Sequence, residues 1–296
     1  MLKTASAAIV CMLLYGMLII PFTTYLRNKP FVEKLGYVPS VTALKSVVAD
    51  HKELVAASLV LKVLMYFGGL LDKADSRVAI PPDYISMSRL LHGAVKLDPY
   101  NMDAYYFAQS FLTWDVKQYK LANDLLDYGM KYRTWDWSLP FYAGFNSAYF
   151  LKDYAAAARY YQRAGELSGS DLSRLLAGRY MQESGQTEMA ISYLSAMLKG
   201  ENNPALKKSY QLRLTAFRET RRIEMARDRY RETRGTLPAT VDQLVSDGFL
   251  SPPPKDPYGG QFYLAADGKV TTTSKYAFGG VKNNSTKKAG EPDERH

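Results

Sequence analysis

The stretch Arg174–Leu198 reads RLLAGRYMQESGQTEMAISYLSAML, and its pattern decides the fold of the chain. Its apolar residues recur at the spacing of α-helices, with polar residues between them. Two small residues, Gly178 and Ala190, stand where paired helices would cross, and small residues let helix backbones approach closely. The stretch therefore predicts an antiparallel pair of α-helices.

The same pattern returns along the chain at nearly constant spacing. One small or apolar position of the second helices recurs at steps of 35, 35 and 33 residues, through Met87, Ala122, Ala157 and Ala190. Two further positions of the second helices recur at the same steps. One runs through Leu91, Leu126, Tyr161 and Leu194, and the other runs through Ala94, Gly129, Ala164 and Met197. In the first helices, one position is shared by Gln109, Gly144 and Gly178. Several helix positions that recur at the same spacing predict stacked helix pairs in a repeat array.

These residues resemble the tetratricopeptide repeat family over roughly residues 83–200, through the stretch quoted above and the turn KLDPYN at Lys96–Asn101. The first two units carry one extra residue between their helices and lack the usual Trp and Pro positions, so the version is divergent. The resemblance implies a right-handed α-solenoid, which we assign to residues 40–203. It also implies that peptides or protein segments bind in the concave face lined by the first helices.

Carried over by position, the resemblance assigns nine residues to that concave face: Tyr106, Ser110, Thr113, Phe141, Phe145, Ala148, Leu175, Arg179 and Gln182. The alternative is that the same side chains only fill the core, because the pattern of small and large residues explains packing without any partner. Three tryptophans near helix ends are expected to pack against turns: Trp114, Trp135 and Trp137.

The N-terminal region contains an apolar run, Ala5–Leu26, which has no charged residue and is long enough to cross a bilayer as a helix. A cleaved signal peptide is the alternative, but no A-x-A-like cleavage site follows the run. We therefore predict a single-pass anchor over residues 1–29 that contacts the membrane through residues 5–26, and a linker over residues 30–39.

The orientation of this anchor depends on opposing signals. Lys3 precedes the apolar run, whereas Arg27, Lys29 and Lys34 follow it. Because the flank with more positive charge usually stays in the cytoplasm, this count slightly favours a cytoplasmic location of the soluble part. The very short N-terminal tail and the family resemblance favour export instead. We predict a bacterial inner-membrane protein whose soluble part is periplasmic.

A second apolar stretch, residues 54–71, also has the length of a membrane span. Lys62 lies at its centre, where a charge is costly in a bilayer, and Gly68 and Gly69 loosen its end. A buried helix of the soluble body is therefore the favoured interpretation.

The net charge of +9 is concentrated in residues 207–234 and in the flanks of the anchor. No helix-turn-helix pattern and no aromatic-plus-basic sheet motif accompanies this charge, so no nucleic-acid partner is expected. We predict that residues 204–234 form a basic helix that caps the array, with its arginines interleaved with Asp and Glu on a solvated face.

The C-terminal region changes to a small α+β module, predicted over residues 235–278. A short helix is expected over residues 239–246, and two strands, residues 261–264 and 269–273, flank the turn at Ala266–Gly268 and form a hairpin. The order of residues from Tyr230 to the D-P-Y-G turn at Asp256–Gly259 resembles the tails of type II secretion major pseudopilins. It also resembles the tails of uncharacterised membrane-anchored bacterial repeat proteins. Residues 279–296 are polar and are predicted to be disordered.

Composition gives little support for catalysis or metal binding. One Cys and three His cannot form a zinc-type cluster, and the chain lacks a nucleophile elbow, a phosphate loop and a paired-carboxylate motif. Asp256 and Asp267 are too few for a calcium site, since turn chemistry already explains both. We expect no enzymatic activity, no cofactor and no metal.

Together, these features predict a membrane-anchored protein-binding scaffold or assembly factor of a cell-envelope, secretion or pilus system. The alternative is a pilin-like structural subunit of such an apparatus. Pilins carry a Gly-Phe cleavage junction before the hydrophobic helix and a Glu at its fifth position, whereas residues 1–10 read MLKTASAAIV. This difference disfavours the pilin-like alternative.

Overall fold

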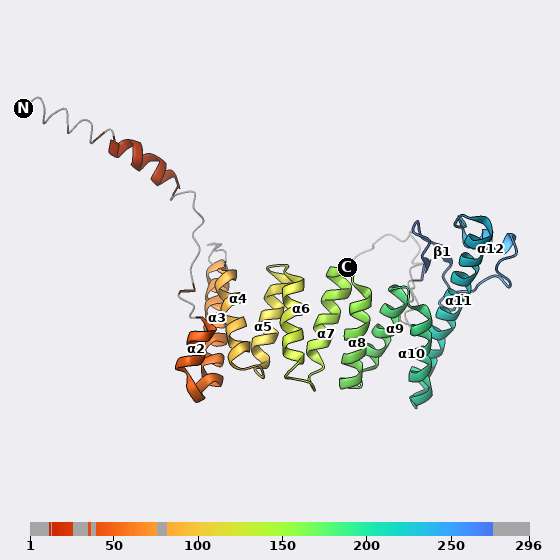
Figure 1. The fold of residues 1–296 in the computed structure, drawn as a ribbon, viewed down its shortest axis with the longest axis horizontal. Coiled ribbons are helices and arrows are strands. Elements are labelled where there is room, and N and C mark those ends of the chain that lie inside the picture. The colour runs from red at the N-terminus through yellow and green to blue at the C-terminus, as the bar shows by residue number, and fades with distance from the viewer. Residues whose placement is uncertain (1–11, 13, 26–34, 37–39, 76–81, 275–296) are drawn as a thin grey trace, which may run out of the picture. The chain divides into compact units, whose positions relative to one another are not determined.

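The structure is a computed structural model of the chain, and it describes residues 12, 14–25, 35–36, 40–75 and 82–274. The chain divides into two compact units, Met1–Gln118 and Tyr119–His296. The described residues are mainly helical and include one small antiparallel sheet (Figure 1), as predicted. The first part of the predicted anchor and the predicted disordered tail lie outside the described residues.

The first unit contains a helix, Leu14–Tyr25, the short helices α2 (Val41–Val47) and η1 (Ala49–His51), and the longer helices α3 (Lys52–Asp75), α4 (Tyr84–Leu97) and α5 (Met102–Trp114). Side-chain oxygens fix two of the helix starts, because Asp83 accepts a hydrogen bond from the backbone N of Ser86, and Asn101 accepts one from Ala104. α3 packs against α4, and α4 packs against α5.

The expectation of a buried helix over residues 54–71 is correct for one face only. α3 buries Ala56, Val60 and Val63, whereas Leu54 and Met65 on its other side are exposed. Lys52–Leu70 is the one helical stretch among the described residues that is long and apolar enough to cross a membrane, and 22% of it is buried. The helix Leu14–Tyr25, which lies within the predicted anchor, is apolar but shorter.

The second unit begins with α6 (Tyr119–Met130), α7 (Ser138–Phe145), the π-helix η2 (Asn146–Leu151), α8 (Tyr154–Ser168), α9 (Asp171–Glu183) and α10 (Thr187–Gly200). Consecutive helices pack against one another. A Cβ atom added to Gly144 would lie 3.2 Å from the ring of Tyr161, and one added to Gly178 would lie 2.9 Å from Cδ2 of Leu194. Tyr161 and Leu194 share one register of the second helices, so the same close contact recurs in two successive pairs.

In the repeat formed by α7 and α8, the extra residue changes the end of the first helix, α7. The backbone N of Asp153 donates across six residues to Ser147 O, whereas the equivalent bond from Gln186 to Met181 O spans five. After α7 the chain takes up the additional residue in the π-helix η2, whose turns are wider than those of an α-helix. The insertion therefore lengthens a helix and does not create a longer loop.

The turns between paired helices require a left-handed backbone at Lys117 (φ 58°), Lys152 (φ 56°) and Gly185 (φ 83°). A residue with a Cβ atom pays about 1–2 kcal/mol in this conformation. We expect Lys117→Gly to raise the free energy of unfolding by about 1 kcal/mol, as measured by chemical denaturation. Lys117→Ala keeps the Cβ atom and should give no such gain. An equal gain from both variants would show that the lysine side chain, and not the backbone, carries the cost.

The long helix α11 (Pro204–Arg234) follows the helix pairs. Its first half packs Tyr210, Leu214 and Phe217 into a core cluster with Leu194 of α10. Its second half packs with α12 (Val241–Ser246) and the strands β1 (Phe262–Leu264) and β2 (Val270–Thr272). The two strands pair antiparallel, with Phe262 opposite Thr272. The predicted hairpin is confirmed, although both strands are shorter than expected.

Several arginines of α11 are bound within the second unit, so the predicted solvated face is only partly correct. Arg213 is buried and donates from Nη1 to the backbone O of Leu175 at 3.4 Å. Arg227 donates to the backbone O of Gly268 at 2.7 Å. Burial follows from position, because the first half of α11 packs on α9 and α10 and its second half packs on the hairpin.

Candidate functional site

In the first unit, the predicted concave-face residues Tyr106, Ser110 and Thr113 lie on α5 and differ in burial. Tyr106 is exposed, whereas Thr113 is only 1% exposed and belongs to the core. Ser110 is half-buried and lines an apolar cleft of about 80 Å³ together with residues of α3, α4 and α5, including Phe67 and Phe111. Tyr106 is therefore open to solvent, and Ser110 lies in the wall of the cleft.

In the second unit, the predicted residues fall into two groups. Ala148, Leu175 and Gln182 are buried, whereas Phe141, Phe145 and Arg179 are half-buried. Ala148 and Leu175 pack into core clusters, because their positions face the neighbouring helices. Phe145 and Arg179 occupy equivalent positions of successive first helices, 34 residues apart. We call the three half-buried residues Phe141, Phe145 and Arg179, together with the exposed Tyr149 of η2, the α7–α9 face.

Consecutive contacts between aromatic rings connect α7 with α9 beneath the α7–α9 face. Phe141 makes an edge contact with Tyr161 at 5.6 Å between ring centroids, and Tyr161 stacks on Tyr180 at 5.6 Å. Tyr180 stacks in turn on Tyr154 at 5.8 Å. Rings held on both sides have few accessible rotamers, so this series presents a rigid surface. The sequence register placed Tyr161 in a second helix, but it could not show that its ring joins two first helices.

A second aromatic group surrounds the π-helix. The rings of Phe145 and Tyr149 stack at 5.5 Å, and Phe150 stacks on Tyr119 at 4.2 Å. Lys152 places its ammonium group 5.3 Å from the centroid of the Tyr149 ring. Tyr149 is exposed and was not predicted, because the π-helix shifts the residues after Phe145 relative to an ideal α-helix.

Buried amides hold the π-helix in place. Asn123 of α6 donates from Nδ2 to Oγ of Ser147 at 3.0 Å, and Asn146 donates from Nδ2 to Oδ1 of Asn123 at 3.0 Å. All three residues are buried, and a satisfied buried network of this kind fixes one geometry. The network therefore fixes η2 relative to α6 and positions the aromatic group around Tyr149.

Arg179 contributes a positive charge to the α7–α9 face. Its Nε is buried and has no hydrogen-bond partner among the described residues, and its guanidinium lies 5.7 Å from the centroid of the Tyr180 ring. Glu183, one turn further along α9, is bound by Lys269 of the hairpin at 2.7 Å. The carboxylate nearest to Arg179 along α9 is therefore already paired with another cation.

The tyrosines beneath the face are neutral at physiological pH. Burial raises the pKa of the Tyr161 hydroxyl above its ordinary value, and the neighbouring Tyr180 adds to this shift. Burial also raises the pKa of Tyr180, although Arg179 acts in the opposite direction. The surface therefore combines neutral aromatic rings with two cationic groups, Arg179 and the Lys152 ammonium group beside Tyr149.

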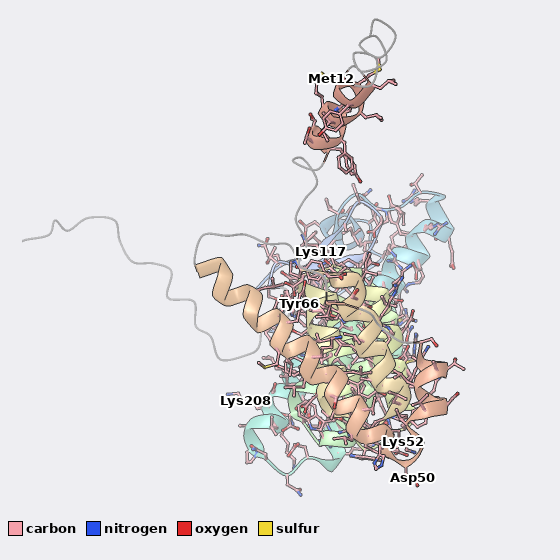
Figure 2. All side chains as sticks on the ribbon, turned by 90° about the vertical axis from the view of Figure 1, so that its left-hand side faces the viewer. Met12, Asp50, Lys52, Tyr66, Lys117 and Lys208 are labelled. Atoms are coloured by element: carbon pink, nitrogen blue, oxygen red, sulfur yellow. The ribbon has the colours of Figure 1, made fainter. Side chains whose placement is uncertain are left out.

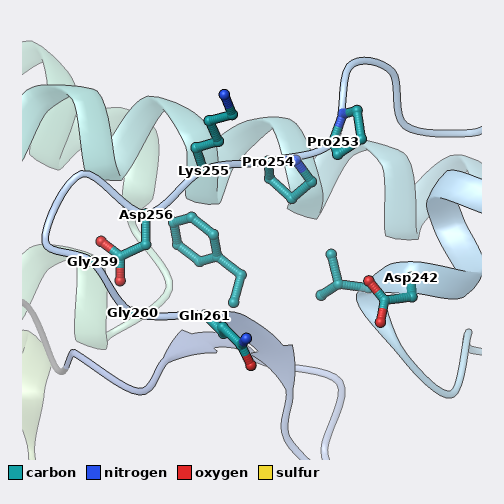
Figure 3. Close-up of a pocket in the computed structure, with 10 residues that line it drawn as sticks. Asp242, Pro253, Pro254, Lys255, Asp256, Gly259, Gly260 and Gln261 are labelled. Atoms are coloured by element: carbon teal, nitrogen blue, oxygen red, sulfur yellow. The ribbon is translucent and has the colours of Figure 1, made fainter.

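A separate polar cleft of about 470 Å³ lies in the C-terminal part of the second unit (Figure 3). Asp242 and Asp256 lie on opposite sides of it, and Pro253 and Pro254 form another wall. The Asp256 carboxylate accepts hydrogen bonds from the backbone N of Tyr258 at 2.8 Å, from Oγ of Ser274 at 2.6 Å and from Oγ1 of Thr272. Asp256 thus holds the turn to the hairpin.

Metal ligands do not gather in the part of the chain that the structure describes. It contains no group of three or more His, Cys, Asp or Glu that could hold an ion. Asp267 accepts a hydrogen bond from the backbone N of Lys269 at 2.9 Å, which is turn chemistry.

Comparison with known proteins gives no family assignment. No protein-family model matches the chain, and no curated protein matches it. A crystal structure of MamA is similar at 17% sequence identity with a TM-score of 0.35, covering 54% of this chain and 85% of MamA. A crystal structure of YrrB, described as a TPR protein with an unusual peptide-binding site, is similar at 19% identity with a TM-score of 0.37. That match covers 72% of this chain and 99% of YrrB, and neither score is high enough to identify a family.

Proposed function

We propose that this chain is a tetratricopeptide-type scaffold that binds a protein segment on the α7–α9 face. The observation that carries the proposal is the combination of half-buried aromatic rings, Phe141 and Phe145, with Arg179, whose buried Nε lacks a partner among the described residues. No catalytic step is part of this function.

The aromatic part of the face explains why a protein segment would bind. Phe145 and Tyr149 form a stacked pair whose position is fixed by the buried amides below η2. Because the rings are already ordered, a ligand that covers them loses little conformational freedom of the protein. Apolar or aromatic ligand side chains suit this surface.

The charged part of the face explains which segment would bind. A partly buried guanidinium forms short, bidentate hydrogen bonds with a carboxylate. Arg179 lies in the first helix next to that of Phe145, so we propose that the bound segment carries an apolar side chain close to a carboxylate.

The membrane part of the proposal rests on the apolar run at residues 5–26. The described helix within it, Leu14–Tyr25, is apolar and exposes its large side chains, including Leu18 and Ile20. We propose that this run anchors the chain in a bacterial inner membrane. The soluble part would then lie in the periplasm and serve a cell-envelope, secretion or pilus assembly.

Selection from a library of random short peptides against the full-length protein in nanodiscs tests the binding site. We expect the selected peptides to combine apolar or aromatic residues with Asp, Glu or a free C-terminus. Arg179→Ala should weaken a selected peptide about 10- to 100-fold, as measured by fluorescence anisotropy, because a hydrogen-bonded charge is lost. Phe145→Ala should also weaken the binding of the selected peptide, because the contact with the phenylalanine ring is lost.

Arg218→Ala is the matched control, because Arg218 is an exposed arginine on a different helix, α11. It should leave the affinity unchanged. Thermal melts would show that all variants are folded. If selected peptides bind the Arg179 and Phe145 variants as tightly as wild type, the face is not the binding site.

A further inference from the structure

α3 carries an apolar surface stripe on its outward side. Leu54, Leu61 and Met65 are 66%, 58% and 70% exposed, and the small residues Ala57 and Ser58 lie between them in the same exposed arc. We call these five residues the α3 stripe. Their spacing of three and four residues places them on one side of the helix.

The stripe is unusual for its place in the fold. α3 packs its opposite side against α4, and in Figure 2 it runs from Lys52 past Tyr66. The helix pair α3–α4 is the first of the described pairs, and the terminal helices of a repeat array normally present a polar outer face. An apolar outer face is therefore unexpected at this position.

A second copy of the chain is a poor occupant of the stripe. The distance from Leu54 to Met65 is eleven residues, or about 17 Å along a helix that is about 10 Å wide. The stripe therefore offers roughly 170 Å² to a partner. A specific protein interface buries about 800 Å² on each side, so the stripe alone is too small.

A lipid surface fits the stripe better, because the chain is already tethered there if residues 5–26 are its anchor. Only residues 27–39 separate the apolar run from Ser40, which caps α2. Tethering raises the local concentration of the stripe at the bilayer, so a small apolar contact is enough for binding.

Charge complementarity identifies the kind of lipid. Lys62 is exposed at the edge of the stripe, and its long apolar stem lets the ammonium group reach a lipid phosphate while the stripe enters the interface. Asp50 lies in η1 and Glu53 in the first turn of α3, both before the first residue of the stripe and therefore at the end distant from Lys62.

We propose that the α3 stripe lies on the surface of an anionic bilayer, with Lys62 at the level of the headgroups. This contact holds the first unit against the membrane from which the anchor emerges. The inference rests on the proposed anchor but is independent of peptide binding at the α7–α9 face.

The test uses the full-length protein, as a single copy in each nanodisc, with Cys11 replaced by serine. An environment-sensitive fluorophore is attached at Met65→Cys, or at Met189→Cys on α10, a similarly exposed methionine, as the matched control. In discs with anionic lipid we expect the label at position 65 to emit at shorter wavelength. Acyl-chain bromines should quench it several-fold more than the label at position 189. Lys62→Glu should reduce this difference.

The outcomes separate the alternatives. Equal emission and quenching at the two positions, in a protein that stays with the discs, would overturn the stripe contact while leaving the anchor intact. Protection of position 65 only when several copies share a vesicle, with a disulfide between two copies of Met65→Cys, would replace the bilayer by a second copy. Failure of the protein to stay with the discs would overturn the anchor and the stripe contact together.

Discussion

Replacement of Leu194 by alanine is expected to lower the free energy of unfolding by about 2–5 kcal/mol. Leu194 is fully buried in the cluster that joins α9, α10 and the first half of α11. Truncation removes buried methyl groups and leaves a cavity in a rigid interface between helices. Chemical denaturation monitored by tryptophan fluorescence and circular dichroism measures this loss.

Gly178 provides a sharper test of the same contact. A Cβ atom at this position would lie 2.9 Å from Cδ2 of Leu194, so Gly178→Ala should destabilise the native protein through overpacking. In the Leu194→Ala background the added methyl group fits into the space that the leucine side chain leaves, and alanine improves the helix propensity by about 1 kcal/mol. We therefore expect Gly178→Ala to become stabilising there. Additive effects of the two changes would contradict the close contact between the helices.

Stability should fall steeply at alkaline pH because two buried tyrosines ionise less readily in the folded chain than in the unfolded chain. Tyr161 is 3% and Tyr210 is 1% exposed. Burial raises the pKa of both hydroxyls, and for Tyr210 the pKa rises to about 12, with the nearby Asp171 contributing. Above pH 10 the unfolded chain releases these two protons while the folded chain keeps them.

The sign of this dependence follows from proton linkage. The folded pKa values lie above the unfolded ones, so this contribution is fully present below pH 10 and is lost as the pH rises toward 12. Each tyrosine lowers the free energy of unfolding by about 1.4 kcal/mol per pH unit in that window. The two together remove roughly 3 kcal/mol per unit.

Denaturation curves between pH 7 and pH 11.5 measure the effect. Between pH 7 and pH 9 the two groups contribute no slope, which serves as the internal control. Tyr161→Phe should reduce the alkaline slope by about 1.4 kcal/mol per pH unit, because the variant has no hydroxyl to ionise. An unchanged slope in this variant would show that Tyr161 already ionises in the folded protein.

The helix pairs were predictable from sequence because one physical requirement repeats. Gly144 and Gly178 must be small where a second helix presses against a first helix, and this requirement recurs at the length of a repeat. The hairpin was predictable for a similarly local reason, since alternating residues flank a turn with glycine at Gly268 (φ 80°).

The candidate site was predictable only in part. Repeat register identifies the first-helix positions, but it does not distinguish Phe145, which is half-buried, from Gln182, which is 2% exposed. The π-helix shifts Tyr149 into contact with Phe145, and no local sequence signal distinguishes a π-turn from an inserted loop residue. Glu183, one turn from Arg179, is paired with Lys269, which lies far away in sequence.

The bond between Lys269 and α9 also affects how the chain matures. Lys269 donates to the backbone O of Glu183, the last residue of α9, across a separation of 86 residues. During synthesis the helix pairs leave the ribosome well before this lysine, so α9 first folds with that carbonyl in water. The ion pair that Glu183 forms with Lys269, one turn from Arg179, is therefore formed last, once the C-terminal hairpin has been made.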